Sequence, residues 1–132
     1  MSRRKAPDTN LIVRLLVDDD PAQSLRARRF FAGGPLYFSA TVLLETEWVL
    51  RASYRKSRPE IANALRQLLA LPEATAEEEP QLLRALDWYG QGMDFADALH
   101  LARRPERVDF FSFDRRLVRR ALALRLPAAL PA

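Results

Sequence analysis

Apolar residues recur at helical spacing along most of the chain. In segment 11–17, Leu11, Leu15 and Leu16 follow this spacing. Pro21 occupies a first helical position, so it predicts the start of a second helix that runs to about residue 31. The same pattern predicts five further helices, over 41–55, from Pro59 to about 71, over 81–89, over 95–104 and over 115–124.

Short segments of strand-like composition separate these helices. A turn at 33–35 precedes the strand predicted over 36–40, and segment 108–113 is the strongest strand pattern in the chain. The acidic segment 73–80 could hold a short edge strand, and 125–130 is predicted as a last strand. Helices that alternate with short strands indicate an α/β fold with a parallel sheet, here as a single domain over 1–132.

Composition narrows the class of protein. The chain has 132 residues, of which 48% are hydrophobic and 29% charged, as is usual for a globular protein. No apolar run approaches the roughly 20 residues that a membrane span needs, and no apolar segment follows the basic N-terminus as a secretory signal requires. The absence of cysteine excludes disulfides and thiol catalysis. We therefore expect a cytoplasmic protein without membrane contact.

The net charge of +4 comes almost entirely from arginine, since Lys5 and Lys56 are the only lysines. Arginine makes forked contacts with phosphate that lysine cannot make. The arginines fall in four clusters along the chain, at 26–29, 51–58, 103–107 and 115–120. A basic surface favours a nucleic-acid partner, although any single arginine could equally be part of a solvated helix face.

Four acidic residues are the candidate catalytic and metal-binding residues: Asp8, Glu45, Asp97 and Asp114. Each lies at a predicted strand end or within an apolar helical stretch. Carboxylates in such places are costly unless a positive charge compensates them. Mg²⁺ and Mn²⁺ prefer oxygen ligands, so the pattern indicates a metal-dependent enzyme that acts on phosphates. We expect the four carboxylates to meet in one pocket.

Glu45 is the sharpest of these cases. None of its helical neighbours at three and four positions is basic, and it is predicted to face the core without a local partner. Glu47 has Arg51 four residues on and is interpreted as a solvated ion pair.

Capping is the main alternative for the other three acids. If Asp94 caps the helix that follows it, Asp97 stands at the third helical position, where a carboxylate favours the helix dipole in any case. Asp8 and Asp114 could likewise cap helices. Both also lie at the carboxyl end of a predicted strand, where α/β sheets place their ligand sites.

Other polar and aromatic groups carry weaker signals. The run 18–20 is acidic, but adjacent side chains diverge and Asp20 before Pro21 is an ordinary helix cap. His100, the single histidine, is interpreted as a helix-surface or packing residue, and Trp48 and Trp88, with Tyr89, as core or interface aromatics. A P-loop is excluded because no glycine precedes a lysine.

Four motifs, DTNLIVRLL, LLETEWVL, DFADALHLA and FSFDRRL, occur in this order. Together they resemble the PIN-domain proteins, and most closely the VapC-type toxins of bacterial toxin–antitoxin pairs, from about Pro7 to Leu124. The resemblance implies a short parallel twisted sheet flanked by helices. It assigns the four acids to the active site, with Thr9, Asn10, Asp94 and Ser112 as accessory residues. The first strand departs from the family, because RRKAP is short and polar, so we expect this strand to be brief or to begin irregularly.

The resemblance also implies a function. Members of this family cleave RNA with Mg²⁺ or Mn²⁺, commonly form homodimers, and are silenced by a cognate antitoxin. The alternative is a catalytically inactive PIN-like module that binds RNA or protein. The intact set of four acids favours the ribonuclease, because a binding module gains nothing from negative charge beside phosphate.

Overall fold

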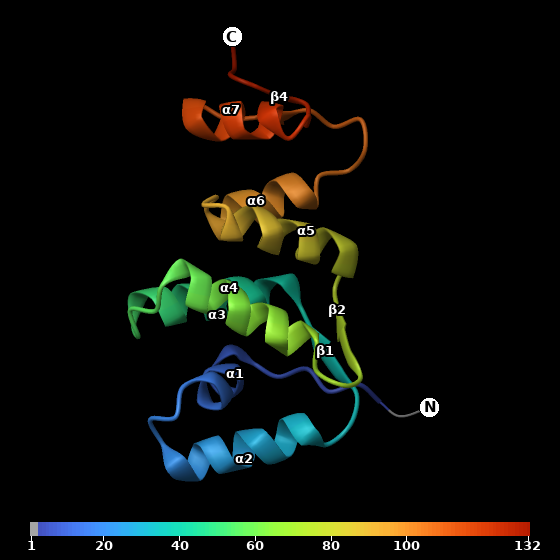
Figure 1. Ribbon diagram of the computed structural model, residues 1–132. Helices are drawn as coiled ribbons and strands as arrows, with labels where there is room; N and C mark the ends of the chain where they lie inside the picture. The colour runs from blue at the N-terminus through green and yellow to red at the C-terminus, as the bar shows by residue number, and fades with distance from the viewer. Residues whose placement is uncertain (1–2) are drawn as a thin grey trace.

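The computed structural model describes residues 3–132, within which the chain forms seven helices and four short strands (Figure 1). The helices are α1 (Thr9–Leu16), α2 (Pro21–Ala32), α3 (Ala40–Ala52), α4 (Arg58–Leu69), α5 (Glu79–Gly90), α6 (Phe95–Ala102) and α7 (Arg115–Ala123). The strands are β1 (Leu36–Phe38), β2 (Ala74–Ala76), β3 (Phe110–Phe111) and β4 (Ala128–Ala129). Every helix and strand predicted from the pattern is confirmed, and several are shorter than predicted.

Helix boundaries follow the capping residues. Asp20 caps α2 by accepting from the Gln23 N–H, and Pro21 then occupies the first turn, where its missing N–H costs nothing. Ser57 and Glu60 form a capping box at the start of α4. The helix predicted over 41–55 ends at Ala52. Local sequence therefore accounts for where most helices begin.

The strands pair in parallel, as predicted, but in two separate sheets. β1 pairs with β2, and β3 pairs with β4. The N-terminal segment joins β1 through a single bridge, Lys5 to Leu36. Pro7 has no N–H to donate, so the ladder cannot extend beyond this point. The brief first strand expected from RRKAP is thus confirmed.

Helix α3 is central to the arrangement of helices. It packs against α1, α4 and α6, while α2 packs on α1 and α5 packs on both α4 and α6. In Figure 1 the helices follow one another from α2 at one end of the molecule to α7 at the other. Asp8 lies at the N-terminus of α1, and Asp97 lies in the first turn of α6. Helix α3, which carries Glu45, packs against both of these helices.

The core is apolar and contains two of the three aromatic residues that the sequence analysis interprets as core or interface residues. Tyr89 is 1% exposed and Trp88 is 8% exposed, so both are core residues. Trp48 is 57% exposed and therefore does not belong to the core. No helix of the described part of the chain is long and apolar enough to cross a membrane.

Candidate active site

Asp8 lies at the carboxyl edge of the first sheet. Because Lys5 pairs with Leu36 in parallel, the segments that follow them leave the sheet on the same side, one into Asp8 and α1, the other into Ser39 and α3. Asp8 caps α1, its Oδ1 accepting from the Leu11 N–H at 2.9 Å. The cap uses one carboxylate oxygen, so the other is available to a ligand.

Asp8 and Glu45 line the same cavity, of about 410 Å³. We call it the acidic cavity. It is open to solvent, and Thr9 and Asn10, expected as accessory residues, lie in its wall. Its lining residues are Ala6, Pro7, Asp8, Thr9, Asn10, Ser39, Thr41, Val42 and Glu45. Two of the four candidate acids are therefore brought together from segments 37 residues apart in sequence (Asp8 to Glu45).

The prediction that Glu45 faces the core is wrong. Glu45 is exposed and points to the acidic cavity, and it makes no hydrogen bond or ion pair with any residue from 3 to 132. Its side chain carries an uncompensated charge at the surface rather than in the interior. Such a carboxylate costs the fold little and leaves both oxygens free for a cation.

The predicted ion pair between Glu47 and Arg51 is confirmed, but its interpretation as solvated is wrong for Glu47, which is the buried glutamate of α3 at 3% exposure. Its carboxylate accepts from Arg51 Nε at 2.8 Å and Nη2 at 3.3 Å, and from the Tyr89 hydroxyl at 3.0 Å. Burial and then the neighbouring Glu47 charge raise the pKa of Tyr89, and the hydrogen bond to Glu47 raises the pKa of Arg51. The negative charge of Glu47 is thus balanced by Arg51 and its carboxylate is hydrogen-bonded.

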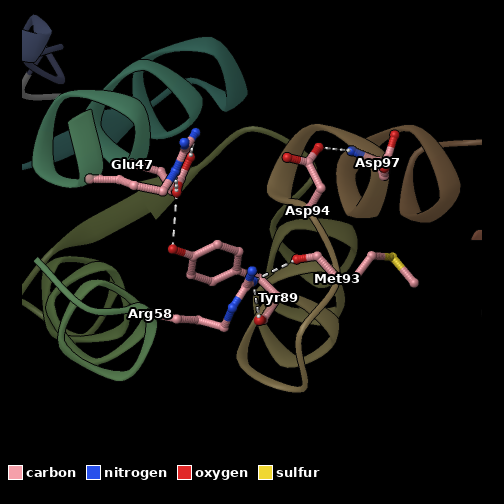
Figure 2. A network of polar contacts seen from close by, with 7 residues as sticks. Glu47, Arg58, Tyr89, Met93, Asp94 and Asp97 are labelled. Atoms are coloured by element: carbon pink, nitrogen blue, oxygen red, sulfur yellow. Dashed lines mark hydrogen bonds and ion pairs between the residues drawn. The ribbon is translucent and has the colours of Figure 1, made fainter. Parts of the chain in front are cut away.

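Arg58 extends this buried network to α5 and α6. Figure 2 shows its guanidinium on one side of the Tyr89 ring, with Glu47 at the ring's hydroxyl end. The guanidinium carbon lies 4.6 Å from the ring centroid, and Nη1 donates to the carbonyls of Tyr89 and Met93, each at 2.8 Å. Met93 immediately precedes Asp94, so these contacts hold the start of α6 in place.

Asp94 and Asp97 stand at the N-terminus of α6. Asp94 is the predicted cap, its Oδ2 accepting from the Asp97 N–H at 3.1 Å (Figure 2). Asp97 is partly buried, and burial followed by the charges of Asp94 and Asp114 raises its pKa. The ionised form of Asp97 is thus disfavoured by its surroundings, which is the electrostatic state that a bound cation would relieve.

Asp114 caps α7, as the sequence allowed. Its Oδ1 accepts from the N–H groups of Arg116 at 3.0 Å and Leu117 at 3.1 Å, and Ser112 Oγ accepts from the Asp114 N–H at 3.0 Å. Ser112 therefore positions the backbone of Asp114. The second Asp114 oxygen makes no hydrogen bond within the described chain. The charge of Asp114 contributes to the raised pKa of Asp97.

The acids form two groups, Asp8 with Glu45 and Asp97 with Asp94 and Asp114. Within residues 3–132, no three acidic or histidine side chains are arranged so that they could hold one metal ion. Mg²⁺ is commonly held by one or two carboxylates together with waters and substrate phosphates. Asp8 and Glu45 offer only oxygen donors, face one cavity and have no basic partner in the described part of the chain, so they fit such an ion. The convergence of all four acids remains a prediction.

Glu77 is a further carboxylate next to α3, and the sequence analysis did not single it out. Its Oε1 accepts from the Ala40 N–H at 2.8 Å, at the start of α3, and its Oε2 accepts from Arg103 at 3.2 Å. Arg103 also binds Glu78 at 2.9 Å. Glu77 is therefore a cap for α3 whose charge is compensated, in contrast to Glu45 on the same helix.

The remaining polar candidates behave as interpreted. Asp20 caps α2, and Asp19 pairs with Arg14 and accepts from the Tyr54 hydroxyl at 2.9 Å, so the acidic run 18–20 is not a metal cluster. His100 is exposed on α6, one turn from Asp97. It acts to lower the pKa of Asp97, but burial and the charges of Asp94 and Asp114 raise that pKa by more.

Comparison with known proteins gives one match. No curated protein and no solved structure matches the chain. A family model, the PIN domain, matches residues 5–123 and so spans all four motifs and all four candidate acids. PIN domains are typically nucleases, which indicates that the substrate is a nucleic acid. With parallel strands, flanking helices and a match over most of its length, the chain belongs to the PIN-domain family.

Proposed function

We propose that this protein is a metal-dependent ribonuclease, similar to the VapC-type toxins, that hydrolyses phosphodiester bonds of RNA with Mg²⁺ or Mn²⁺. One observation carries the proposal. Glu47, which lies in α3, and Glu77, which caps α3, are each paired with an arginine. Asp8 and Glu45, in contrast, face one cavity without a basic partner among the described residues. These two exposed carboxylates are thereby left open to a cation and its bound waters, which the arginine-paired glutamates are not.

Each acid has a proposed role in binding or proton handling. Asp8 and Glu45 would hold the cation through their free oxygens, and Asp97 and Asp114 would add ligands or hydrogen-bond acceptors for a water. The ion would lower the pKa of a bound water and neutralise charge on the phosphate. Asp97, whose pKa is raised by burial and by its acidic neighbours, is suited to accept a proton from that water.

The test is cleavage of a panel of structured RNAs by the purified protein, with Mg²⁺ or Mn²⁺ and with EDTA. Asp8→Asn should abolish cleavage while preserving the helix cap, because asparagine caps as well as aspartate. Asp20→Asn is the matched control, since Asp20 caps α2 in the same way and does not line the acidic cavity. RNA binding without cleavage by the parental protein would instead favour a catalytically inactive module.

We further propose that the protein is held inactive in the cell by a cognate antitoxin and that it forms a homodimer. The exposed Trp48, one helical turn from Glu45, is the candidate contact residue, whereas the buried Trp88 is not. Expression without the partner should be toxic to a bacterial host, and Asp8→Ala should remove the toxicity. Harmless expression of folded, intact protein would contradict the toxin role, and light scattering would determine the oligomeric state.

A further inference from the structure

A second cavity, of about 350 Å³, lies between α1 and α2 and opens beside the acidic cavity. The two cavities share Asp8 and Asn10, so they form neighbouring parts of one surface depression. We call the second one the arginine cleft. Its lining residues are Asp8, Asn10, Leu11, Arg14, Gln23, Arg26 and Phe30.

Among the described residues that line this cleft, Arg26 is a cation without an ion-pair partner. It is exposed on α2 and makes no ion pair with any residue of the described chain, although Asp8 lines the same cavity. The helical spacing of Gln23, Arg26 and Phe30 places them on one face of α2. Arg28 and Arg29 are also exposed but do not line the cleft, so Arg26 is the arginine that α2 contributes to it.

Two further cations, Arg14 and Lys5, lie beside the cleft and differ in how their charge is balanced. The Arg14 side chain is 19% exposed and is held by Asp19 and by the Tyr54 hydroxyl at 3.4 Å, while its buried Nε has no partner. Lys5 Nζ lies 4.3 Å from the centroid of the Phe30 ring and donates to two backbone carbonyls, and no carboxylate among residues 3–132 pairs with it. The unpaired positive charge at the cleft therefore comes from Arg26, with Lys5 beside Phe30 at its edge, whereas the charge of Arg14 is balanced by Asp19.

We propose that the arginine cleft binds the phosphate of the RNA nucleotide next to the one that is cleaved, an inference that rests on the proposed ribonuclease function. Arg26 supplies the forked contact to the phosphate oxygens. The amides of Asn10 and Gln23 face the same space and can contact the sugar or a base edge. The adjoining carboxylates would hold the metal at the scissile phosphate, and the cleft would fix the register of the strand.

The test uses a 12-nucleotide single-stranded RNA of mixed sequence, with binding followed by fluorescence anisotropy in EDTA so that nothing is cleaved. Arg26→Ala should raise Kd about tenfold at low salt and make the dependence of log Kd on log salt less steep by about 0.7, the value for one lost single-strand phosphate contact. Arg28→Ala, on another face of the same helix, should change neither quantity. Arg26→Lys should retain the salt dependence with weaker binding.

The inference would be overturned if Arg26→Ala and Arg28→Ala, both shown to be folded by circular dichroism, bound the RNA with equal Kd. It would also be overturned if the parental protein bound no RNA. Failure of the proposed function is a separate outcome: RNA bound in an Arg26-dependent manner but left uncut with Mg²⁺ and Mn²⁺ supports the cleft and contradicts the nuclease. For a cleaved RNA, a single neutral methylphosphonate beside the cleavage site should weaken binding to the parent but not to Arg26→Ala. Equal weakening of both proteins at every position would contradict the phosphate contact.

Discussion

Glu45 and Glu47 lie two residues apart on α3, yet their surroundings are opposite in kind. Glu47 is buried and receives three hydrogen bonds from Arg51 and Tyr89, whereas Glu45 is exposed and receives none within the described chain. Burial of a carboxylate therefore does not mark the one that is proposed to act in catalysis. The distinguishing property is compensation: the compensated glutamate joins helices, and the uncompensated one faces the acidic cavity with Asp8.

The largest effect expected from this comparison is on cleavage. Glu45→Gln should reduce the rate of RNA cleavage by at least about 10²-fold, because the amide cannot supply the negative charge that the cation requires. Its thermal stability should match that of the parent, since the side chain is exposed. Single-turnover cleavage and a thermal melt measure the two quantities. Parental cleavage by Glu45→Gln would remove this residue from the active site.

Glu47→Ala should show the opposite behaviour and lower the free energy of unfolding by about 2–3 kcal/mol. The substitution leaves the Tyr89 hydroxyl buried without its acceptor and removes the partner of Arg51. Urea unfolding measures the change, and Tyr89→Phe, which removes one hydrogen bond and no charge, should cost about 1 kcal/mol. A stable Glu47→Ala protein with lost cleavage would reverse the roles assigned to the two glutamates.

Metal binding should stabilise only a protein in which both cavity acids are intact. At Mg²⁺ or Mn²⁺ concentrations ten times Kd, the parent should gain about 1.4 kcal/mol, a rise in melting temperature of about 5 °C. Asp8→Asn and Glu45→Gln should gain much less, whereas Asp20→Asn should respond as the parent does. The same rise in all four proteins would indicate that the ion binds elsewhere.

The smallest expected effect is a pH-dependent gain in stability for Asp97→Asn in EDTA. The folded-state pKa of Asp97 is above its ordinary value of 3.8, so the folded protein binds this proton more tightly than the unfolded chain does. The ionised carboxylate therefore destabilises the parent, fully above the folded pKa and not below 3.8. Asp97→Asn should be slightly more stable than the parent at pH 7 and equal to it below pH 3.8. A less stable variant at pH 7 would show that capping dominates.

Local signals allowed most of the fold to be predicted, since helix caps such as Asp94 and strand segments such as 108–113 depend on nearby residues. The orientation of α3 was not predicted correctly. Leu43 and Leu50 stand four before and three after Glu47, and both are buried, so the helical pattern did contain the signal that places Glu47 inward. Its partner Tyr89 lies 42 residues away, a tertiary contact that no local pattern reveals.

The division of the strands into two sheets bears on how the candidate acids can meet. Asp8 follows the segment bridged to β1, whereas Asp114 follows β3, and no ladder hydrogen bond joins these sheets in residues 3–132. Relative displacement of the two sheets therefore breaks no backbone pairing. The spacing between the first and last acid is therefore set by the packing of the intervening helices and not by a shared sheet. A cation drawn between the two acids would therefore act against helix packing and not against strand pairing.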